Sequence, residues 1–343
     1  MDSTPAFSDQ PMIFVTGASR SGTTMLSRMF GLHSQVCGFK ELHCFGELIP
    51  NHALDATLSK ADGVQLCAKL IARSKRDIWG DVEQSDIAQA ETLMEGYAGS
   101  FKAGDIAACA FYFIAESQGK TVPCEQTPRN IFYAKQLLDF YPNLHIVHIV
   151  RDPRDVLASQ KNRWKRKRFG GDNIPWSEII RVWCNYHPHT ITKLWKQANN
   201  LALGIEGHER FHMLRFEDVV ESPEATVKAA AQATGVAFEP AMLQIAQVGS
   251  SHKTNADNTL GVAKTALNRW QKTLSPGEIA ICESVASQPA MEKFGYQTSP
   301  PISKFSLSFI KQILKYPVHV VGVLASNPKR AWILLHAAVV KRK

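Results

Sequence analysis

The chain has 343 residues, of which 45% are hydrophobic and 20% charged, so it is a packed globular protein and not a disordered one. Its 39 Lys and Arg exceed its 31 Asp and Glu, which gives a net charge of +8. This balance favours an anionic partner, whether nucleotide, nucleic acid, acidic glycan or membrane surface, without choosing among them.

Seven cysteines are scattered along the chain, and no pair has the C-x-x-C spacing of a zinc ribbon or a thioredoxin-like site. Their placement predicts free thiols in a reducing compartment. The N-terminal residues lack a basic stretch followed by an apolar run, so no signal peptide is predicted. No stretch reaches the roughly 18–20 apolar residues of a membrane-spanning helix. We therefore expect a cytoplasmic protein that is neither secreted nor membrane-spanning.

Short apolar runs alternate with helix-like segments along the chain. Strands are predicted at residues 12–16, 144–150 and 211–216. Helices are predicted at residues 22–32, 128–140, 154–164, 176–198 and 223–234, and residues 54–117 are mostly helix-like. This alternation predicts an α/β fold with a mostly parallel sheet. The only predicted boundary lies near Pro300–Pro301, between a domain of residues 1–300 and a tail of residues 301–343.

Residues 12–26 read MIFVTGASRSGTTML, a strand that runs through a glycine-flanked turn into a helix. Such a turn aims backbone N–H groups and the positive end of the helix dipole at one point, which suits a phosphate or sulfate group. The spacing from Gly17 to Gly22 matches the start of a Walker A motif, but Thr23 replaces its lysine. The loop carries its cation earlier, at Arg20, whose guanidinium can bind an anion through two hydrogen bonds. The alternative is a turn that binds no ligand.

Residues 144–160 read LHIVHIVRDPRDVLASQ. Arg151 lies at the carboxyl end of a predicted parallel strand, where open α/β sheets bind their ligands. Ser159 follows on the next predicted helix, so both side chains can reach one phosphate across the turn. The alternative is an arginine that pairs with Asp152 or Asp155.

Together the two segments resemble a known family. RSGTT after an apolar strand is similar to the 5′-phosphosulfate loop of sulfotransferases that use 3′-phosphoadenosine 5′-phosphosulfate (PAPS), and RDPRDVLAS resembles their 3′-phosphate motif. The resemblance extends to Leu214–Asp218 and Asn268–Lys272 and covers about residues 12–296. It implies a P-loop-like three-layer fold, with a central mostly parallel sheet flanked by helices and a helical C-terminal tail.

The resemblance also implies roles in sulfuryl transfer from PAPS, with adenosine 3′,5′-bisphosphate as product and no metal. The residues that would hold the 5′-phosphate and the sulfuryl group are Arg20, Ser21, Gly22, Thr23 and Thr24. Arg151 and Ser159 would hold the 3′-phosphate, which distinguishes this nucleotide from ATP. Lys264 or Arg269 would reach the same phosphate from a loop that closes over the nucleotide. By analogy with phosphoryl transfer, the protein mainly positions groups and stabilises charge.

An acceptor hydroxyl also needs a general base. In the tyrosylprotein and carbohydrate branches of the family, a glutamate at about this distance after the RSGTT loop acts as the base, and Glu41 matches that offset. His43 is the alternative, since the small-molecule branch uses histidine. Gln126 replaces the usual lysine of the family's K-T-P segment and can donate a hydrogen bond without charge. Lys40 and Arg129 are candidates to substitute for that lysine.

Residues 161–168 read KNRWKRKR and carry six positive charges. No nucleic-acid-binding fold accompanies this run, so nucleic acid is disfavoured as a partner. The run is expected to be a solvated face or the rim of a site for an anionic acceptor.

The tail, residues 301–343, mixes apolar runs with Lys and Arg. Phe305, Phe309, Ile313 and Tyr316 approximate one helical face. A basic amphipathic segment of this kind lies on a membrane interface, covers a core or contacts the partner in a homodimer. The first choice would make the protein peripheral at the inner membrane surface.

The sequence therefore predicts a PAPS-dependent sulfotransferase acting on a hydroxyl of a carbohydrate or lipid-linked glycan, or of a peptide tyrosine. One rival is a P-loop kinase or other nucleotide phosphotransferase, against which Thr23 and the Arg151–Ser159 segment count. The other rival is a family member with weak or no catalysis that binds an anionic nucleotide or a membrane lipid. Gln126, in place of the family's usual lysine, supports this alternative.

Overall fold

A strand with apolar residues on both faces belongs in the middle of a parallel sheet, and Met12–Gly17 (β1) is buried throughout. The computed structural model describes residues 7–50, 53–161, 163–164, 176–246, 260–300 and 306–327. Within them β1 is the central strand of a five-stranded parallel sheet. The other strands are Val36–Gly38 (β2), Val122–Glu125 (β3), Leu144–Val150 (β4) and Phe211–Arg215 (β5). Their order across the sheet is β2-β3-β1-β4-β5.

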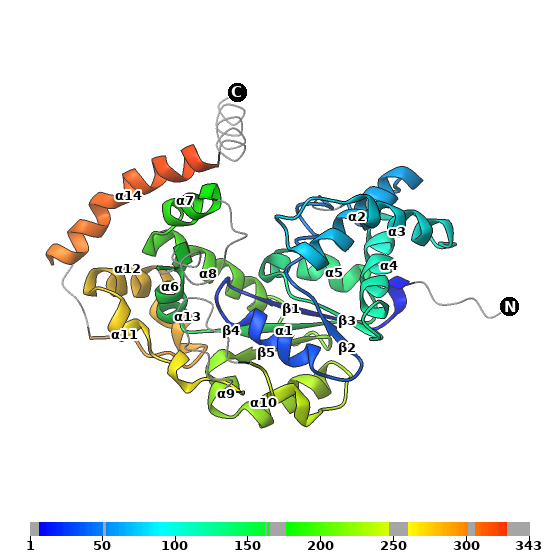
Figure 1. Ribbon diagram of the computed structural model, residues 1–343. Coiled ribbons are helices and arrows are strands. Elements are labelled where there is room, and N and C mark those ends of the chain that lie inside the picture. The colour runs from blue at the N-terminus through cyan, green and yellow to red at the C-terminus, as the bar shows by residue number, and fades with distance from the viewer. Residues whose placement is uncertain are drawn as a thin grey trace. The chain divides into compact units, whose positions relative to one another are not determined.

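The described chain divides into two compact units. The first comprises Met1–Arg151, Ala198–Gln247 and Asn258–Lys264, and it contains the sheet. The second comprises Asp152–Gln197, Val248–Asp257 and Thr265–Lys343. Figure 1 shows their elements by label.

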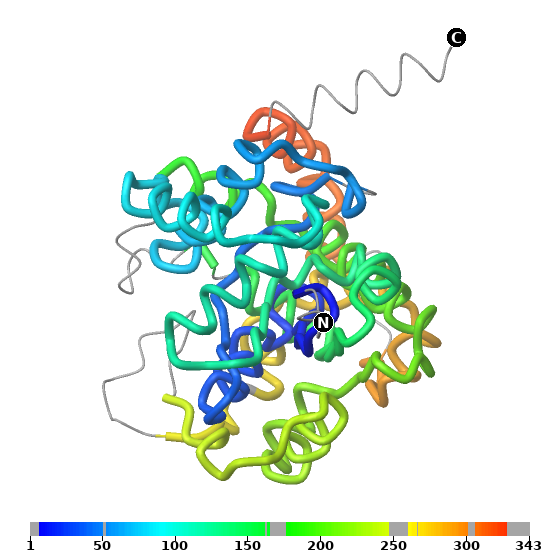
Figure 2. Tube along the Cα trace, turned by 90° about the vertical axis from the view of Figure 1, so that its right-hand side faces the viewer, coloured from blue at the N-terminus to red at the C-terminus, as the bar shows by residue number. Residues whose placement is uncertain are grey.

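The helices of the first unit are Thr23–Gly31 (α1), Lys60–Arg76 (α2), Gln84–Glu95 (α3), Ala103–Glu116 (α4), Ala134–Phe140 (α5), Phe216–Glu221 (α9) and Pro223–Ala233 (α10). A 3₁₀ helix, Pro128–Tyr133, leads into α5. Figures 1 and 2 show α2 and α3 side by side, and α4 also packs against α2. The core of this unit includes Phe14 of β1, whose ring lies 5.8–6.4 Å from the rings of Phe45, Phe111 and Tyr141.

The helices of the second unit are Pro153–Lys161 (α6), Trp176–Cys184 (α7), Trp270–Thr273 (α11), Pro276–Ala286 (α12), Gln288–Glu292 (α13) and Leu307–Ser326 (α14). The helix Pro188–Leu203 (α8) begins in this unit and ends in the first. The core of the second unit includes Leu157, Ala158, Leu274 and Cys282, with Trp270 packed against them.

Most predicted elements are confirmed, but the single helix expected at residues 176–198 is wrong. The chain forms α7 and α8 instead, because Pro188 disfavours helical backbone at the residue before it and suits the first turn of a new helix. β2 and β3 were not predicted, since they have only three and four residues and β3 contains Pro123. All seven cysteines are free, as expected.

Candidate active site

Loops that follow four of the parallel strands leave the same edge of the first unit's sheet. Residues 18–22 follow β1, Glu41 follows β2, Gln126 follows β3 and Arg151 follows β4. The strand order places Glu41 and Gln126 to one side of the β1 loop and Arg151 to the other. Open α/β sheets bind ligands outside this edge, so the candidate site lies here.

The loop after β1 is shaped to bind an anion. Arg20 has a φ of 77° and Gly22 a φ of 110°, so two nearly adjacent residues take the left-handed conformation from which backbone anion nests are built. The Ser21 N–H donates to the carbonyl of Ala18 at 3.0 Å and closes the turn. The first N–H groups of α1, from Thr23 on, have no acceptor within the helix and carry its positive dipole end. The loop therefore offers several donors to one anionic group.

Side chains add polar groups to this loop. Ser21 is completely buried, and its hydroxyl has no hydrogen-bond partner among the described residues. A buried hydroxyl without a partner is costly, and a phosphate or sulfate oxygen would accept its hydrogen bond. The Thr24 hydroxyl donates to the side-chain carbonyl of Gln126 at 3.4 Å, so the residue after β3 contacts the first turn of α1. The role of Gln126 in the site stays a prediction.

Arg151 is fixed against the same loop from the other side. Its Nη1 donates to the carbonyl oxygen of Arg20 at 3.3 Å, and its guanidinium carbon lies 4.1 Å from the centre of the Phe216 ring. Such a cation–π contact is worth about 0.5–2 kcal/mol. Phe216 also lies close to Gly22, where an added Cβ would come within 2.5 Å of the ring. Phe216 therefore fixes both Arg151 and the backbone of the loop.

The two aspartates of the RDPRD segment, Asp152 and Asp155, bind other groups of the second unit. Asp152 pairs with Arg154 at 2.7 Å, and Arg154 also pairs with Glu283 at 2.9 Å. The backbone N–H groups of Asn268 and Trp270 both donate to Asp155 at 2.9 Å. Both aspartates of the segment therefore have partners within the second unit.

Glu41 and His43 form an ion pair after β2. His43 Nε2 lies 3.1 Å from Glu41 Oε2, and His43 Nδ1 lies 3.2 Å from Glu47 Oε1. Burial alone would lower the pKa of His43, but hydrogen bonds to the two carboxylates outweigh it and raise the pKa to about 9. The hydrogen bond from His43 in turn lowers the pKa of Glu47. His43 is therefore a cation at neutral pH and not a free base.

Glu125 holds the segment that carries Glu41 and His43, a role that sequence reasoning missed. Its buried carboxylate accepts from the Leu42 N–H at 3.2 Å, the Thr127 N–H at 2.8 Å and the Thr127 hydroxyl at 2.5 Å. It also accepts from the side-chain amide of Asn130 at 2.6 Å. The signal available in the sequence was a carboxyl residue directly before Gln126.

Arg73 of α2 fixes the same segment from outside. Its Nη1 donates to the carbonyl oxygens of Leu42 at 2.6 Å and His43 at 3.1 Å. Its Nη2 lies 3.3 Å from Glu47 Oε2. No sequence pattern pointed to this arginine, because thirty residues separate it from the loop. Lys40, a predicted substitute for the missing lysine, is exposed and pairs with Asp77 at 3.2 Å.

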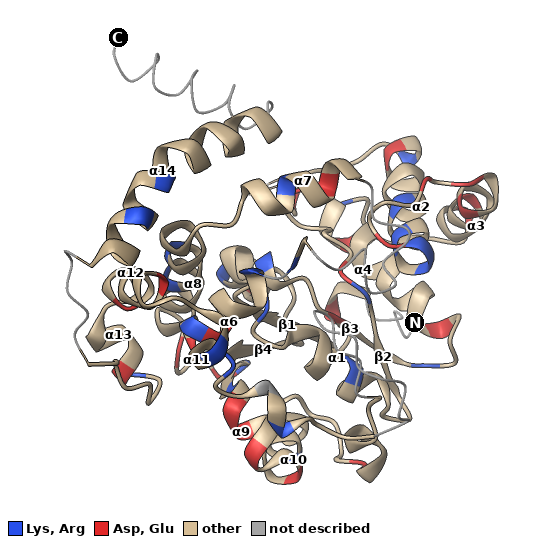
Figure 3. Ribbon diagram, turned by 60° about the vertical axis from the view of Figure 1, so that its left-hand side comes forward, with Lys and Arg blue, Asp and Glu red and all other residues tan. Residues whose placement is uncertain are grey.

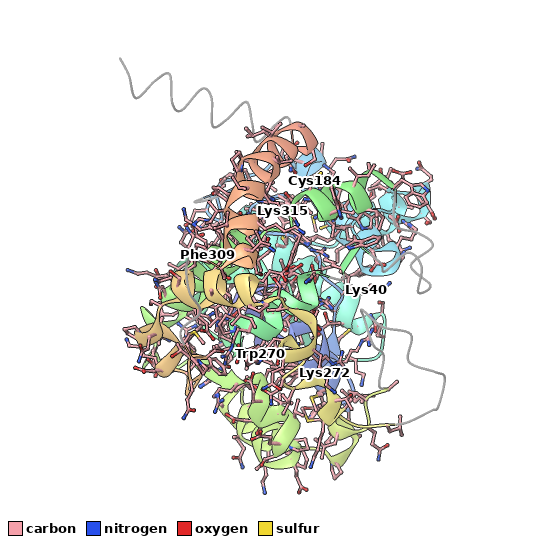
Figure 4. All side chains as sticks on the ribbon, turned by 90° about the vertical axis from the view of Figure 1, so that its left-hand side faces the viewer. Lys40, Cys184, Trp270, Lys272, Phe309 and Lys315 are labelled. Atoms are coloured by element: carbon pink, nitrogen blue, oxygen red, sulfur yellow. The ribbon has the colours of Figure 1, made fainter. Side chains whose placement is uncertain are left out.

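The remaining predicted nucleotide contacts lie on separate segments. Ser159 lies on α6 in the second unit. Lys264 is exposed and belongs to the first unit, and Arg269 belongs to the second, where its Nε donates to the Thr265 carbonyl at 2.5 Å. Trp270, labelled in Figure 4, lies with its ring centre 4.1 Å from the Arg154 guanidinium carbon. Their approach to a nucleotide stays a prediction.

Only three residues of the basic run at 161–168 are described. Of these, Lys161 donates to Glu278 at 2.7 Å and to the Thr273 carbonyl at 2.9 Å, so it supports α12 within the second unit. Residues 165–168 lie outside the described part, and the rim role predicted for them remains a prediction.

None of the helices in the described part of the chain has both the length and the hydropathy needed to cross a membrane. In the same residues no group of three or more His, Cys, Asp or Glu side chains is arranged to hold a metal ion.

The parallel sheet with an anion loop after its central strand places the chain among α/β proteins of P-loop-like architecture. The Sulfotransferase family model matches residues 11–240, more than half of the chain. The chain therefore belongs to the Sulfotransferase family, which confirms the resemblance seen in RSGTT and RDPRDVLAS.

Individual relatives are more distant. Carbohydrate sulfotransferase 3 of Tetronarce californica is 28% identical over 197 residues, which are 52% of this chain and 41% of that protein. Carbohydrate sulfotransferase 6 of Homo sapiens is 27% identical over 176 residues, 45% of this chain and 42% of that protein. The chain thus spans about two fifths of the length of these relatives.

A solved structure shares the fold. The sulfotransferase domain from the curacin biosynthetic pathway is 18% identical and superposes with a TM-score of 0.50. The match covers 84% of this chain and 99% of that domain. The predicted fold class, a central parallel sheet with flanking helices and a C-terminal helix, is confirmed.

Proposed function

We propose that this protein transfers a sulfuryl group from PAPS to an acceptor hydroxyl. The observation that carries the proposal is the β1 loop, where the left-handed Arg20 and Gly22 surround a Ser21 hydroxyl that is buried without a partner in the described chain. These residues fit the phosphosulfate end of PAPS, which would give Ser21 an acceptor. Arg20, Thr23 and Thr24 complete the donors of this loop.

The 3′-phosphate of the nucleotide is assigned to Arg151. Phe216 and the Arg20 carbonyl already orient its guanidinium, so little side-chain entropy is lost when it binds an anion. Ser159, Lys264 and Arg269 keep their proposed roles in the same contact.

When bound, PAPS would supply the sulfuryl group that is transferred in line to the acceptor oxygen. The Gln126 amide, beside Thr24, would donate a hydrogen bond where negative charge develops. Glu41 would accept the proton of the acceptor hydroxyl, a contribution of typically about 10²–10⁴-fold. The cationic His43 orients this carboxylate and is a poor base at neutral pH.

The acceptor that we favour is a carbohydrate hydroxyl, because two relatives bear the name carbohydrate sulfotransferase. A lipid-linked glycan is the next choice and a peptide tyrosine the third. A lipid-linked acceptor would place the protein at the surface of the inner membrane.

Calorimetric titration tests the nucleotide assignment. The purified chain is titrated with adenosine 3′,5′-bisphosphate, with 5′-AMP and with ATP plus magnesium. The proposal expects tight binding of the bisphosphate that is lost in Arg151→Ala, because the 3′-phosphate then has no guanidinium. Equal or tighter binding of ATP would overturn it in favour of a phosphotransferase.

Sulfate transfer from labelled PAPS to a panel of carbohydrate acceptors tests the chemistry. Glu41→Gln should abolish transfer while the bisphosphate still binds, since the glutamine cannot take the proton. Gln126→Lys restores the charge found in the family and should not lower the rate. If no acceptor is sulfated by either the wild type or Gln126→Lys, the protein is a nucleotide-binding member without catalysis.

A further inference from the structure

Helix α14 forms hydrogen bonds with the rest of the second unit on one side and exposes aliphatic side chains on the other. The Gln312 carbonyl oxygen lies 3.1 Å from His187 Nε2, and His319 Nδ1 donates to the carbonyl of Cys184 at 2.7 Å. The large aliphatic side chains that α14 exposes are Leu307, Ile310, Ile313, Leu314, Val318, Val320, Val321 and Leu324. A helix on the surface of a globular protein normally shows the reverse arrangement.

The residues predicted to share one helical face differ in their exposure. Phe309 and Tyr316 are half-buried toward the second unit, but Ile313 is 51% exposed, and Phe305 lies outside the described residues. The most exposed positions, Leu307 at 83% and Val318 at 73%, were not part of that face.

The neighbouring helix α7 exposes apolar side chains as well. Trp176, Ile180 and Trp183 are 68%, 58% and 64% exposed, and their spacing of four and three residues places them on one helical face. α7 packs against α14, where a Cβ added at Gly322 would meet the Cys184 sulfur at 3.5 Å. These two helices hold eleven of the seventeen large hydrophobic side chains that are exposed in the described chain. Apolar surface gathered in this way marks an interaction site.

The positive charge of the C-terminal segment indicates which kind of partner binds this surface. Residues 301–343 contain eight Lys and Arg and no Asp or Glu, so they account for the whole excess of +8. Two of them, Lys311 and Lys315, are exposed on α14, and Figure 3 shows its two basic bands without an acidic one. Figure 4 labels Lys315 and Phe309 along α14 and Cys184 on α7. Two copies that met through such segments would repel each other, whereas an anionic surface would attract them.

We propose that α7 and α14 together form a docking surface for a bilayer with anionic phospholipid head groups. Lying in the interface, α14 would bury its aliphatic side among the acyl chains while its lysines reach the phosphates. Tryptophans such as Trp183 suit the boundary between acyl chains and head groups. The proposal deepens the lipid-linked acceptor proposed above, on which its biological role rests, but the binding itself requires neither nucleotide nor acceptor.

Co-sedimentation of the full chain with vesicles tests the surface. Vesicles of phosphatidylcholine alone are compared with vesicles that also contain phosphatidylserine, without nucleotide. The proposal expects binding to the mixed vesicles that weakens as the salt concentration rises, because the phosphatidylserine charge is then screened. No binding to the mixed vesicles would overturn it.

Variants assign the binding to α14 and α7. Leu314→Ser combined with Val318→Ser removes two exposed aliphatic side chains and should weaken vesicle binding about tenfold or more. Trp183→Ser is the independent variant on α7 and should also weaken binding. The matched control is Leu201→Ser on α8, where an exposed leucine outside the surface should leave binding unchanged. The assignment would be overturned if Leu201→Ser loses as much vesicle binding as the other variants. It would also be overturned if neither the α7 variant nor the α14 variant loses any.

Sedimentation velocity separates the bilayer from a second copy. The proposal would be overturned if the protein forms a dimer, does not bind vesicles, and becomes monomeric when Leu314→Ser is combined with Val318→Ser. The surface would then be assigned to self-association. The titration with adenosine 3′,5′-bisphosphate is independent of this result. If the protein does not bind vesicles, the sulfotransferase proposal can still stand. If it does not bind the bisphosphate, the bilayer proposal can still stand.

Discussion

The guanidinium carbon of Arg151 lies 4.1 Å from the centre of the Phe216 ring, and the edge of the same ring approaches Gly22. One aromatic side chain after β5 thus supports both the cation after β4 and the anion loop after β1. If the proposed nucleotide binds here, its affinity should depend on a residue that carries no charge.

Phe216→Leu should lower the affinity for adenosine 3′,5′-bisphosphate about three- to tenfold. The leucine fills much of the volume but removes the cation–π contact, which is worth about 0.5–2 kcal/mol. Phe216→Tyr keeps the ring and should bind as the wild type does. Calorimetric titration measures both, and equal affinities for all three proteins would show that Phe216 does not orient Arg151.

Gly22→Ala should abolish bisphosphate binding and destabilise the fold by more than the left-handed backbone alone explains. The residue has a φ of 110°, and its new Cβ would lie 2.5 Å from Phe216. Gly207→Ala is the control, since Gly207 has a φ of 90° and no atom within 4 Å of an added Cβ. The control should cost about 1–2 kcal/mol of unfolding free energy and leave binding intact. Urea unfolding and calorimetric titration compare the two variants. Equal losses of unfolding free energy and of bisphosphate affinity in both would contradict a role for the contact between Gly22 and Phe216.

His43→Gln should lower the free energy of unfolding at neutral pH. The difference from the wild type should become smaller as the pH rises. The pKa of His43 is raised from 6.5 to about 9, because the Glu41 and Glu47 carboxylates outweigh the effect of burial. A raised pKa stabilises the folded state fully below pH 6.5, and this stabilisation is lost as the pH rises through about 9. Urea unfolding of both proteins from pH 6 to 10 measures the difference. A difference that does not change with pH would contradict the ion pair.

Glu125→Gln should lower the rate of sulfate transfer more than the affinity for the bisphosphate. The carboxylate accepts from two backbone N–H groups and two side chains, and the glutamine would turn an NH₂ group toward some of these donors. Each buried donor left unsatisfied costs about 1–3 kcal/mol, so the segment around Glu41 should loosen. Glu116→Gln, at an exposed position, is the control. An equal fall in rate and in nucleotide affinity would instead indicate general unfolding.

Acidification should loosen α14 from the rest of the second unit. Burial is the main cause that lowers the pKa of both His187 and His319, and neighbouring histidines and, for His187, Lys315 lower it further. Their neutral forms therefore stabilise the packed helix above pH 6.5, and this contribution is lost as the pH falls below that value. Hydrogen exchange of the α14 amides at pH 7.5 and pH 5 measures the effect. His187→Gln with His319→Gln should flatten the pH dependence, and a dependence that persists would exclude this pair.

The elements that could be predicted from the amino-acid sequence are those whose signals are local. β1 and β4 are continuous apolar runs, the loop between Gly17 and Gly22 has glycines where the backbone turns, and Arg151 stands directly after a strand. Burial of a strand and left-handed backbone at a glycine depend on a few neighbouring residues, so their pattern can be read from the chain. The family followed from the same short segments.

The residues that support the candidate site from distant segments could not be predicted without the three-dimensional fold. Arg73 reaches Leu42 from α2, Glu125 accepts from the Leu42 N–H, and Phe216 meets Arg151. Each of these contacts joins segments that are far apart in sequence and depends on strand order and helix packing. The same is true of α14, whose helical pattern could be read but not the side that it would bury. His187 and Cys184 form hydrogen bonds with its inward side, and this pairing joins segments more than 120 residues apart in the sequence.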